Sequence, residues 1–244
     1  MKQKTAFVTG SSSGIGKAIT ARLLKDGIKV IGIARDHSKF NPSAANYFPI
    51  TFDLSDVGNL EKTTKSILKE HPDINVFISN AGYGAFQHIE NFSTSQIQEF
   101  LNVNLISQII LCRHLTSHLK TIDGGDIIIL GSEAALAGKR KAALYSAAKF
   151  GLRGFVQALR DEVGNSGIAV CLINPGLVRT PFFENLDFRP GDLQTNAIEP
   201  DDIAKIVSEL LDTRNGTIID EINLSPSSNT VIFKSEMSQK DITR

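Results

Sequence analysis

The sequence predicts a single α/β domain built on a doubly wound, mainly parallel sheet of seven strands, with helices on both faces. Short β-branched runs alternate with longer helical patterns along the chain, as expected where a helix joins each strand to the next parallel one. The predicted strands are also nearly continuous apolar runs rather than alternating ones. Such runs are typical of strands that are covered on both faces.

Six apolar runs and a last edge strand form the predicted sheet, at residues 5–10, 28–34, 46–52, 74–80, 125–132, 168–174 and 216–224. Helical patterns are expected between the strands, at residues 14–26, 56–71, 94–119, 143–165 and 200–212. Only residues 35–45 connect the second strand to the third, and Pro42 lies among them. A helix there is therefore at most a turn or two long.

The chain shows no internal repeat and no linker, so we expect one domain over residues 1–224. A polar C-terminal tail follows over residues 225–244, and we expect it to be partly disordered or to pair at the surface. Residues 235–244 are expected to be frayed, whereas residues 230–233 could form a short pairing segment.

The composition excludes several classes of protein. Lysine plus arginine equals aspartate plus glutamate, at 26 each, which argues against nucleic acid or an anionic membrane as a partner. There is no apolar signal core at the N-terminus and no run of about 20 apolar residues. Cys112 and Cys171 lie in apolar segments and indicate free thiols. These three observations predict a soluble, cytoplasmic protein. His114 and His118 lack an obvious third ligand, so we expect no metal site.

A glycine-rich turn follows the first predicted strand. The stretch TGSSSGIGKA places Gly10, Gly14 and Gly16 where strand becomes helix. Such a turn can bring backbone N–H groups and a helix N-terminus to an anion, although these glycines could also simply make a tight turn. Its place after the first strand of a parallel series favours a dinucleotide site at the carboxyl ends of the strands.

Tyr145 and Lys149 lie four residues apart on a mostly apolar predicted helix, in LYSAAKFGLRGF, and so share one face. They could be a hydrogen-bonded tyrosine and a lysine that extends to water. Alternatively, they form an acid–base pair. Lowering a tyrosine pKa from about 10 to about 7 takes roughly 4 kcal/mol, and an ammonium about 4 Å away supplies roughly that at an effective dielectric constant near 20.

Two more polar residues stand out against apolar surroundings. Asn104 lies on the buried stripe of its helix, where an unsatisfied amide would cost about 1–3 kcal/mol; it needs a structural hydrogen bond or a functional role. Ser132 directly follows the apolar strand DIIILGS. It could cap a turn, or it could face a ligand at the strand end.

These motifs occur in an order that resembles the short-chain dehydrogenases/reductases over residues 5–224. The matching pieces are Thr9-Gly10-x-x-x-Gly14-Ile15-Gly16, Asp53-Leu54, Asn80-Ala81-Gly82, Asn104, Ser132, Tyr145-x-x-x-Lys149 and Pro175-Gly176-Leu177-Val178-Arg179-Thr180. The step of thirteen residues from Ser132 to Tyr145 also fits. The usual glycine-rich final strand of the family is missing. The sequence therefore does not predict what the C-terminal residues contribute to the substrate pocket.

The resemblance implies a Rossmann-like oxidoreductase that transfers hydride between a nicotinamide dinucleotide and a carbonyl or secondary alcohol. It implies that Tyr145 donates or removes the proton, Ser132 hydrogen-bonds the carbonyl oxygen, Lys149 reaches the nicotinamide ribose and Asn104 positions a water. The implied cofactor contacts are Gly10, Ser12, Gly14, Ile15, Gly16, Arg35, Asp53, Leu54, Asn80, Ala81, Gly82, Tyr145, Lys149, Pro175, Gly176, Val178 and Thr180. The alternative is a non-catalytic sensor or scaffold protein that binds the dinucleotide.

The end of the second strand, read as GIARD, bears on the choice of nicotinamide cofactor. If Ala34 occupies the usual acidic position, Arg35 faces the ribose and can bind a 2′-phosphate. A one-residue shift would instead place Asp36 there. We therefore expect NADP(H) to be favoured over NAD(H).

Two remaining features concern partners. The helix that carries Tyr145 is apolar on nearly all sides, which favours a homodimer or homotetramer, as the family commonly forms through this helix. Near the small-molecule substrate, Phe182, Phe183, Leu186 and Phe188 could line a pocket or dock their loop. The neighbouring cations Lys139, Arg140 and Lys141 could form a solvated loop or attract an acidic substrate.

Overall fold

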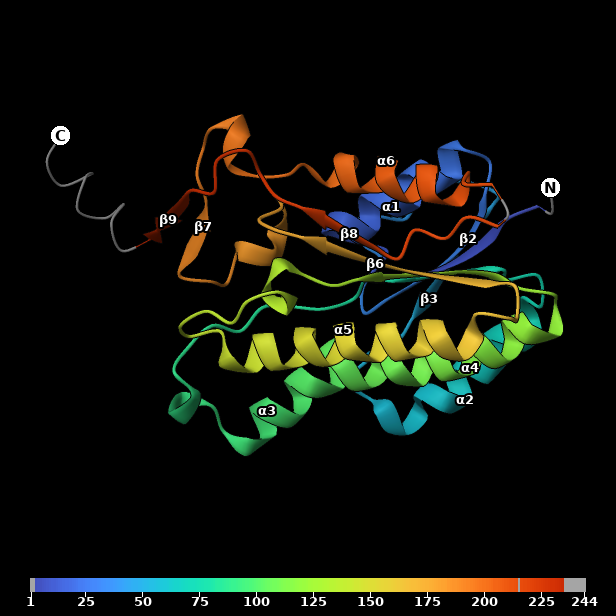
Figure 1. The fold of residues 1–244 in the computed structure, drawn as a ribbon, viewed down its shortest axis with the longest axis horizontal. Coiled ribbons are helices and arrows are strands. Elements are labelled where there is room, and N and C mark those ends of the chain that lie inside the picture. The colour runs from blue at the N-terminus through green and yellow to red at the C-terminus, as the bar shows by residue number, and fades with distance from the viewer. Residues whose placement is uncertain (1–2, 215, 235–244) are drawn as a thin grey trace, which may run out of the picture.

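The computed structural model, which describes residues 3–214 and 216–234, contains a seven-stranded sheet in the order β3-β2-β1-β4-β5-β6-β8 (Figure 1). Every neighbouring pair in this sheet is parallel. The strands are β1 (Thr5–Thr9), β2 (Lys29–Ala34), β3 (Tyr47–Thr51), β4 (Val76–Ser79), β5 (Gly125–Leu130), β6 (Ile168–Pro175) and β8 (Glu221–Leu224). The predicted doubly wound fold is confirmed.

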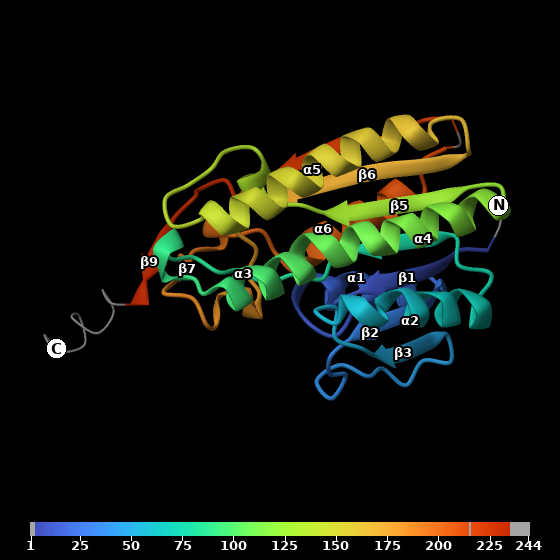
Figure 2. The same cartoon turned by 90° about the horizontal axis from the view of Figure 1, so that it is seen from below.

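Helices cover both faces of the sheet (Figures 1 and 2). They are α1 (Gly14–Lys25), α2 (Val57–Glu70), α3 (Thr94–Leu101), α4 (Ser107–Thr121), α5 (Ala143–Val163) and α6 (Pro200–Leu211). Adjacent residues of β5 show why the strands read as continuous apolar runs: Ile127 packs in the core beneath α2, α4 and α5, and Ile128 packs in the core beneath α1 and α6. Both side chains are buried.

Two predicted elements differ from those observed. The helix expected over 94–119 is interrupted by a π-helical turn, Asn102–Ile106, between α3 and α4, because apolar periodicity does not distinguish one helical hydrogen-bond pattern from another. The edge strand expected over 216–224 pairs with β6 only from Glu221 onwards. The β-branched side chains of Ile218 and Ile219 favoured a longer strand, but both residues are exposed and lie outside the sheet. Cys112 and Cys171 are free and buried, as predicted.

The segment after β8 folds back to one end of the sheet. β9 (Val231–Phe233) pairs antiparallel with β7 (Phe188–Pro190), which follows β6 in the chain, and both lie near the N-terminal end of α5 in the two views (Figures 1 and 2). Residues 235–244, for which fraying was expected, lie outside the described residues.

The strand order places the turns after β1, β4, β5 and β6 at one edge of the sheet. The order reverses between β1 and β4, where parallel α/β sheets form a ligand crevice at the carboxyl ends of their strands. Gly10, Asn80, Ser132 and Gly176 each follow one of these strands. Among the described residues, no helix is long and apolar enough to cross a lipid bilayer.

Candidate active site

Tyr145 and Lys149 lie one turn apart near the start of α5, and both side chains are buried, at 8% and 5% exposure. The Lys149 ammonium donates a hydrogen bond to the carbonyl oxygen of Leu130 at 3.0 Å and lies 5.9 Å from the centre of the Tyr145 ring. A side-chain hydrogen bond links Tyr145 to Ser132. The structure therefore brings these three predicted residues together, and Lys149 does not extend to water.

Burial dominates the electrostatics of this group. It raises the pKa of Tyr145 to about 12, a rise that the hydrogen bond from Ser132 opposes. Burial also lowers the pKa of Lys149 to about 8. The expectation that Lys149 alone brings the Tyr145 pKa near 7 is thus not met in the ligand-free protein, because desolvation penalises both charged forms. Tyr145 is neutral there at physiological pH and carries a proton that it can donate.

Ser132 caps a turn, which is one of the two roles that its sequence position allowed, and it also lines the cavity beside Tyr145. Its side chain caps the short turn Glu133–Ala135 by accepting the N–H of Ala134 at 3.1 Å, and it also contacts Tyr145. The backbone N–H of Ser132 donates to the side-chain oxygen of Asn174 at 3.2 Å. Ser132 is therefore held in place from two sides.

Asn174 is a functional candidate that the sequence analysis missed. It is 1% exposed at the end of β6, and its amide donates to Glu221 at 2.7 Å and to Asn223 at 2.9 Å. Arg153 of α5 in turn pairs with Glu221 at 3.0 Å. Asn174 thus links Ser132 to β8 and α5. The available signal was a polar residue at the end of the apolar run IAVCLIN.

Asn104 is fully buried in the π-helical turn and its amide is satisfied within the protein. The amide nitrogen donates to Phe100 at 3.1 Å, and the amide oxygen accepts the N–H of Tyr83 at 3.2 Å. Its backbone oxygen accepts from Gln108 at 2.9 Å. Gln108, also buried and also missed from the sequence, sits one helical turn after Asn104 and accepts from Ser79 at 3.1 Å.

The glycine turn leaves the N-terminus of α1 accessible to an anion. Gly10 and Gly14 adopt φ of +68° and +50°, a region that favours glycine, and a Cβ on Gly16 would lie 2.2 Å from the Gly10 oxygen. The N-cap residue Ser13 makes no side-chain cap, and the first turn of α1 holds no acidic residue. The backbone N–H groups at the start of α1 fit a pyrophosphate, with Ser12 and Ile15 half-buried beside them.

The loops after β4 and β6 are fixed against this turn. Asn80 and Ala81 each donate their N–H to the Thr9 hydroxyl, at 2.9 and 3.0 Å. A Cβ on Gly82 would lie 2.8 Å from the Asn104 oxygen, so the loop after β4 runs directly over the π-helical turn. Thr180 borders the turn from the other side, because a Cβ on Gly14 would lie 3.3 Å from its side chain.

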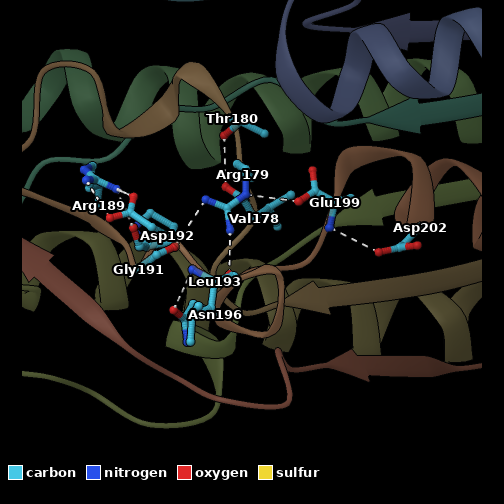
Figure 3. A network of polar contacts seen from close by, with 11 residues as sticks. Val178, Arg179, Thr180, Arg189, Gly191, Asp192, Leu193, Asn196, Glu199 and Asp202 are labelled. Atoms are coloured by element: carbon cyan, nitrogen blue, oxygen red, sulfur yellow. Dashed lines mark hydrogen bonds and ion pairs between the residues drawn. The ribbon is translucent and has the colours of Figure 1, made fainter.

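Of the residues after Pro175, some lie at the cavity or in the core, and Arg179 binds a neighbouring loop. Gly176 lines the cavity beside Tyr145, and Val178 is buried. Arg179, by contrast, points into the loop that precedes α6, where it pairs with Glu199 at 3.0 Å and donates to the backbone oxygens of Gly191 and Leu193 (Figure 3). Arg179 therefore holds the loop over residues 181–199 rather than a ligand.

Arg35 and Asp36 are both exposed after β2, and Asp36 is engaged locally. Its carboxylate accepts the N–H and the hydroxyl of Ser38, at 2.7 and 2.8 Å, and these bonds lower its pKa. Arg35 and Asp53 lie close enough to Tyr83 to influence its pKa, and Leu54 is buried. Arg35 is thus at the same edge as the glycine turn and the loop after β4.

A cavity of about 770 Å³ opens beside Ser132 and Tyr145. Of the residues expected to line a pocket, Phe182, Phe183 and Phe188 do so. Leu186 instead lines a neighbouring hollow of about 410 Å³. The cavity also contains two rings that the sequence analysis did not assign to it, Phe86 and Phe233.

The sequence is similar to proteins of a known family of dehydrogenases. Residues 4–189 match the family model described as short chain dehydrogenase. The chain is 32% identical to a 3-oxoacyl-(acyl-carrier-protein) reductase of Buchnera aphidicola over 77% of this chain and 78% of that protein.

Solved structures give the same result over more of the chain. A metagenomic short-chain oxidoreductase in complex with NADP matches with a TM-score of 0.79 and 26% identity, over 93% of this chain and 99% of that one. An alcohol dehydrogenase from Thermococcus sibiricus, complexed with 5-hydroxy-NADP, matches with a TM-score of 0.81 and 26% identity, over 93% and 97% of the two chains. The chain therefore belongs to the short-chain dehydrogenase family and is an oxidoreductase.

Proposed function

We propose that this protein transfers hydride between NADP(H) and a carbonyl or secondary alcohol, with Tyr145 as the acid or base. The observation that supports this most directly is that Ser132 and Tyr145 lie together at the wall of a cavity, with the buried Lys149 ammonium 5.9 Å from the Tyr145 ring centre. The cavity lies at the carboxyl edge of the sheet, beside a glycine turn whose N–H groups fit a pyrophosphate.

Bound NADP(H) would supply or accept the hydride. In reduction, Tyr145 gives its hydroxyl proton to the carbonyl oxygen, and the substrate becomes an alcohol. Ser132 hydrogen-bonds that oxygen and holds it within reach of Tyr145. In oxidation, the Tyr145 phenolate takes the proton from the alcohol.

Lys149 supplies positive charge beside Tyr145 and can bind the nicotinamide ribose. An ammonium has three donors, and in the described part of the chain one hydrogen bond from Lys149, to Leu130, is formed. The Lys149 charge and that of an oxidised nicotinamide would together favour the phenolate, so a bound oxidised cofactor would lower the Tyr145 pKa from about 12. Asn104 would position a water in the same proton path.

The remaining cofactor contacts follow the edge of the sheet. Around the pyrophosphate they are Gly10, Ser12, Gly14, Ile15 and Gly16; on the adenosine side Arg35, Asp53, Leu54, Asn80, Ala81 and Gly82; and on the nicotinamide side Pro175, Gly176, Val178 and Thr180. Preference for NADP(H) is supported by the exposed guanidinium of Arg35 beside an Asp36 that is already engaged by Ser38. Both structural relatives described above were solved with NADP or a derivative of it.

We further propose a cytoplasmic protein whose dinucleotide-binding oxidoreductase domain spans residues 1–224. A homodimer or homotetramer would cover the outer side of α5, where Phe150 is 44% exposed next to Ala147, Gly151 and Gly154.

Replacing Tyr145 by Phe is expected to lower kcat by about 10²–10⁴-fold, because a proton donor of this kind contributes that much. The dissociation constant for NADP⁺ should change little, since the ring still packs against Phe86 at 5.1 Å between centroids. Steady-state kinetics and fluorescence titration measure the two quantities. The matched control is Tyr83→Phe, which removes a hydroxyl from an exposed tyrosine. Substantial turnover by Tyr145→Phe would exclude it as the donor, and wild-type protein that reduces no carbonyl would favour the sensor alternative.

Arg35→Ala should weaken NADP⁺ binding by about 10–100-fold and leave NAD⁺ binding nearly unchanged, because a charge-assisted bond to the 2′-phosphate is lost. Calorimetric titration with both dinucleotides checks this. Lys25→Ala is the control, since Lys25 lies at the far end of α1. Equal affinity of the wild-type protein for the two dinucleotides would contradict the assignment.

Asn174→Ala is expected to lower kcat by about tenfold or more with little change in the KM for NADPH, because Ser132 loses its backbone anchor. It should also lower the free energy of unfolding by about 1–3 kcal/mol, as buried groups lose their partners. Asn223→Ala removes an exposed partner of Asn174 without touching Ser132 and serves as the control. If both variants lose kcat in proportion to their stability, Asn174 has no positioning role.

A further inference from the structure

The cavity beside Tyr145 has an aromatic wall that the proton transfer itself does not require. Five phenylalanines line it: Phe86, Phe182, Phe183, Phe188 and Phe233. Phe86 lies 5.1 Å from both Tyr145 and Phe188, and Phe182 lies 6.1 Å from Tyr145, as ring-centre distances. Edge-to-face and tilted contacts of this kind suit a flat apolar group placed among the rings.

The same cavity has a positively charged rim, formed by two segments far apart in the sequence. Lys139, Arg140 and Lys141 line it from the loop before α5, and Lys234 lines it from the residue after β9. The only carboxylates among the described lining residues are Glu133 and Asp187. The chain as a whole has a net charge of zero, so this excess of positive charge is local.

Most of this charge is not neutralised by the protein. Lys139 pairs with Glu133 at 2.8 Å, whereas Lys234 donates to neutral backbone oxygens, of Glu184 at 2.7 Å and of Phe183 at 3.4 Å. Within residues 3–214 and 216–234, Arg140 and Lys141 form no ion pair. Three cations therefore face the cavity with one carboxylate, Asp187, beside them.

Lys141 occupies its position despite an unfavourable backbone. Its φ is +62°, in the left-handed region that residues other than glycine and asparagine rarely adopt. Such conformations cluster at ligand-binding sites. A glycine would fit the same turn without strain but would bring no charge.

We propose that the natural substrate is a ketone, or the corresponding secondary alcohol, that joins an aromatic or similarly flat apolar body to a carboxylate. The body packs among Phe86, Phe182 and Phe188, and the carboxylate lies towards Arg140, Lys141 and Lys234. This assignment rests on the proposed function, because it uses the same cavity and the same Tyr145.

A matched pair of substrates tests the carboxylate directly: 4-oxo-4-phenylbutanoate and its methyl ester, each with NADPH. At low ionic strength we expect kcat/KM for the acid to exceed that for the ester by about tenfold, since charge complementarity favours encounter and binding. The advantage should shrink as salt is added, because exposed charges are screened. An acid and an ester that react equally well at low salt would overturn the proposal.

Substitutions in the positively charged rim test which residues cause the preference for the acid over the ester. Arg140→Glu and Lys141→Gly should each lower the acid-to-ester ratio of kcat/KM by about 3–10-fold. Lys141→Gly relieves the strained backbone, so unfolding would not explain its effect. The control is Lys62→Glu, an equal change of charge to Arg140→Glu on the exposed side of α2. Rim variants that leave the ratio at the wild-type value would contradict the proposal.

Direct binding separates this proposal from the proposed function. Calorimetry measures binding of 4-oxo-4-phenylbutanoate to the wild-type and Arg140→Glu proteins, each saturated with NADP⁺. If neither compound is reduced but the acid binds and Arg140→Glu weakens it about fivefold, the anion site stands and the catalytic assignment fails. If the ester alone is reduced and the acid does not bind, the catalytic assignment stands and the anion site is wrong.

Discussion

The desolvation of Tyr145 and Lys149 is the constraint on which the rest of the site depends. Both groups are buried at the start of α5, and burial moves their pKa values in opposite directions, to about 12 and about 8. Each shift favours the neutral form, so the ligand-free protein holds a tyrosine that keeps its proton. Additional positive charge from an oxidised cofactor would then decide when Tyr145 ionises. Burying an ammonium beside a phenol is unfavourable for stability, and such unfavourable arrangements are typical of functional sites.

Two polar networks within the protein connect the elements around this site. On one side, Ser79, Gln108 and Asn104 connect β4 to the π-helical turn. On the other, Asn174 connects Ser132 to Glu221, which Arg153 of α5 also binds. Buried polar groups with satisfied partners favour one arrangement over alternatives. The cavity beside Tyr145 is built differently, from phenylalanines of segments that are separate in the sequence, including β7 and β9.

The sequence could predict the parts of the site that depend on local spacing. A separation of four residues puts Tyr145 and Lys149 on one helix face, and the glycine turn follows from its place between a strand and a helix. It could not predict the link between Asn174 and Glu221, which are 47 residues apart, or that Phe86 and Phe233 share a cavity. The sequence also could not predict the direction of the Tyr145 pKa shift, because that direction depends on desolvation by segments distant in the chain.

We propose that Tyr145 becomes acidic only when the oxidised cofactor is bound. The chain has three tyrosines and no tryptophan, so ultraviolet difference titration can follow phenolate formation cleanly. Burial raises the pKa of the other two tyrosines, Tyr47 and Tyr83, as well. We expect no phenolate below about pH 10 in the free protein. With NADP⁺ bound, we expect a phenolate that forms near neutral pH and is absent from Tyr145→Phe. A complex with NADP⁺ in which no tyrosine ionises below about pH 10 would contradict the account.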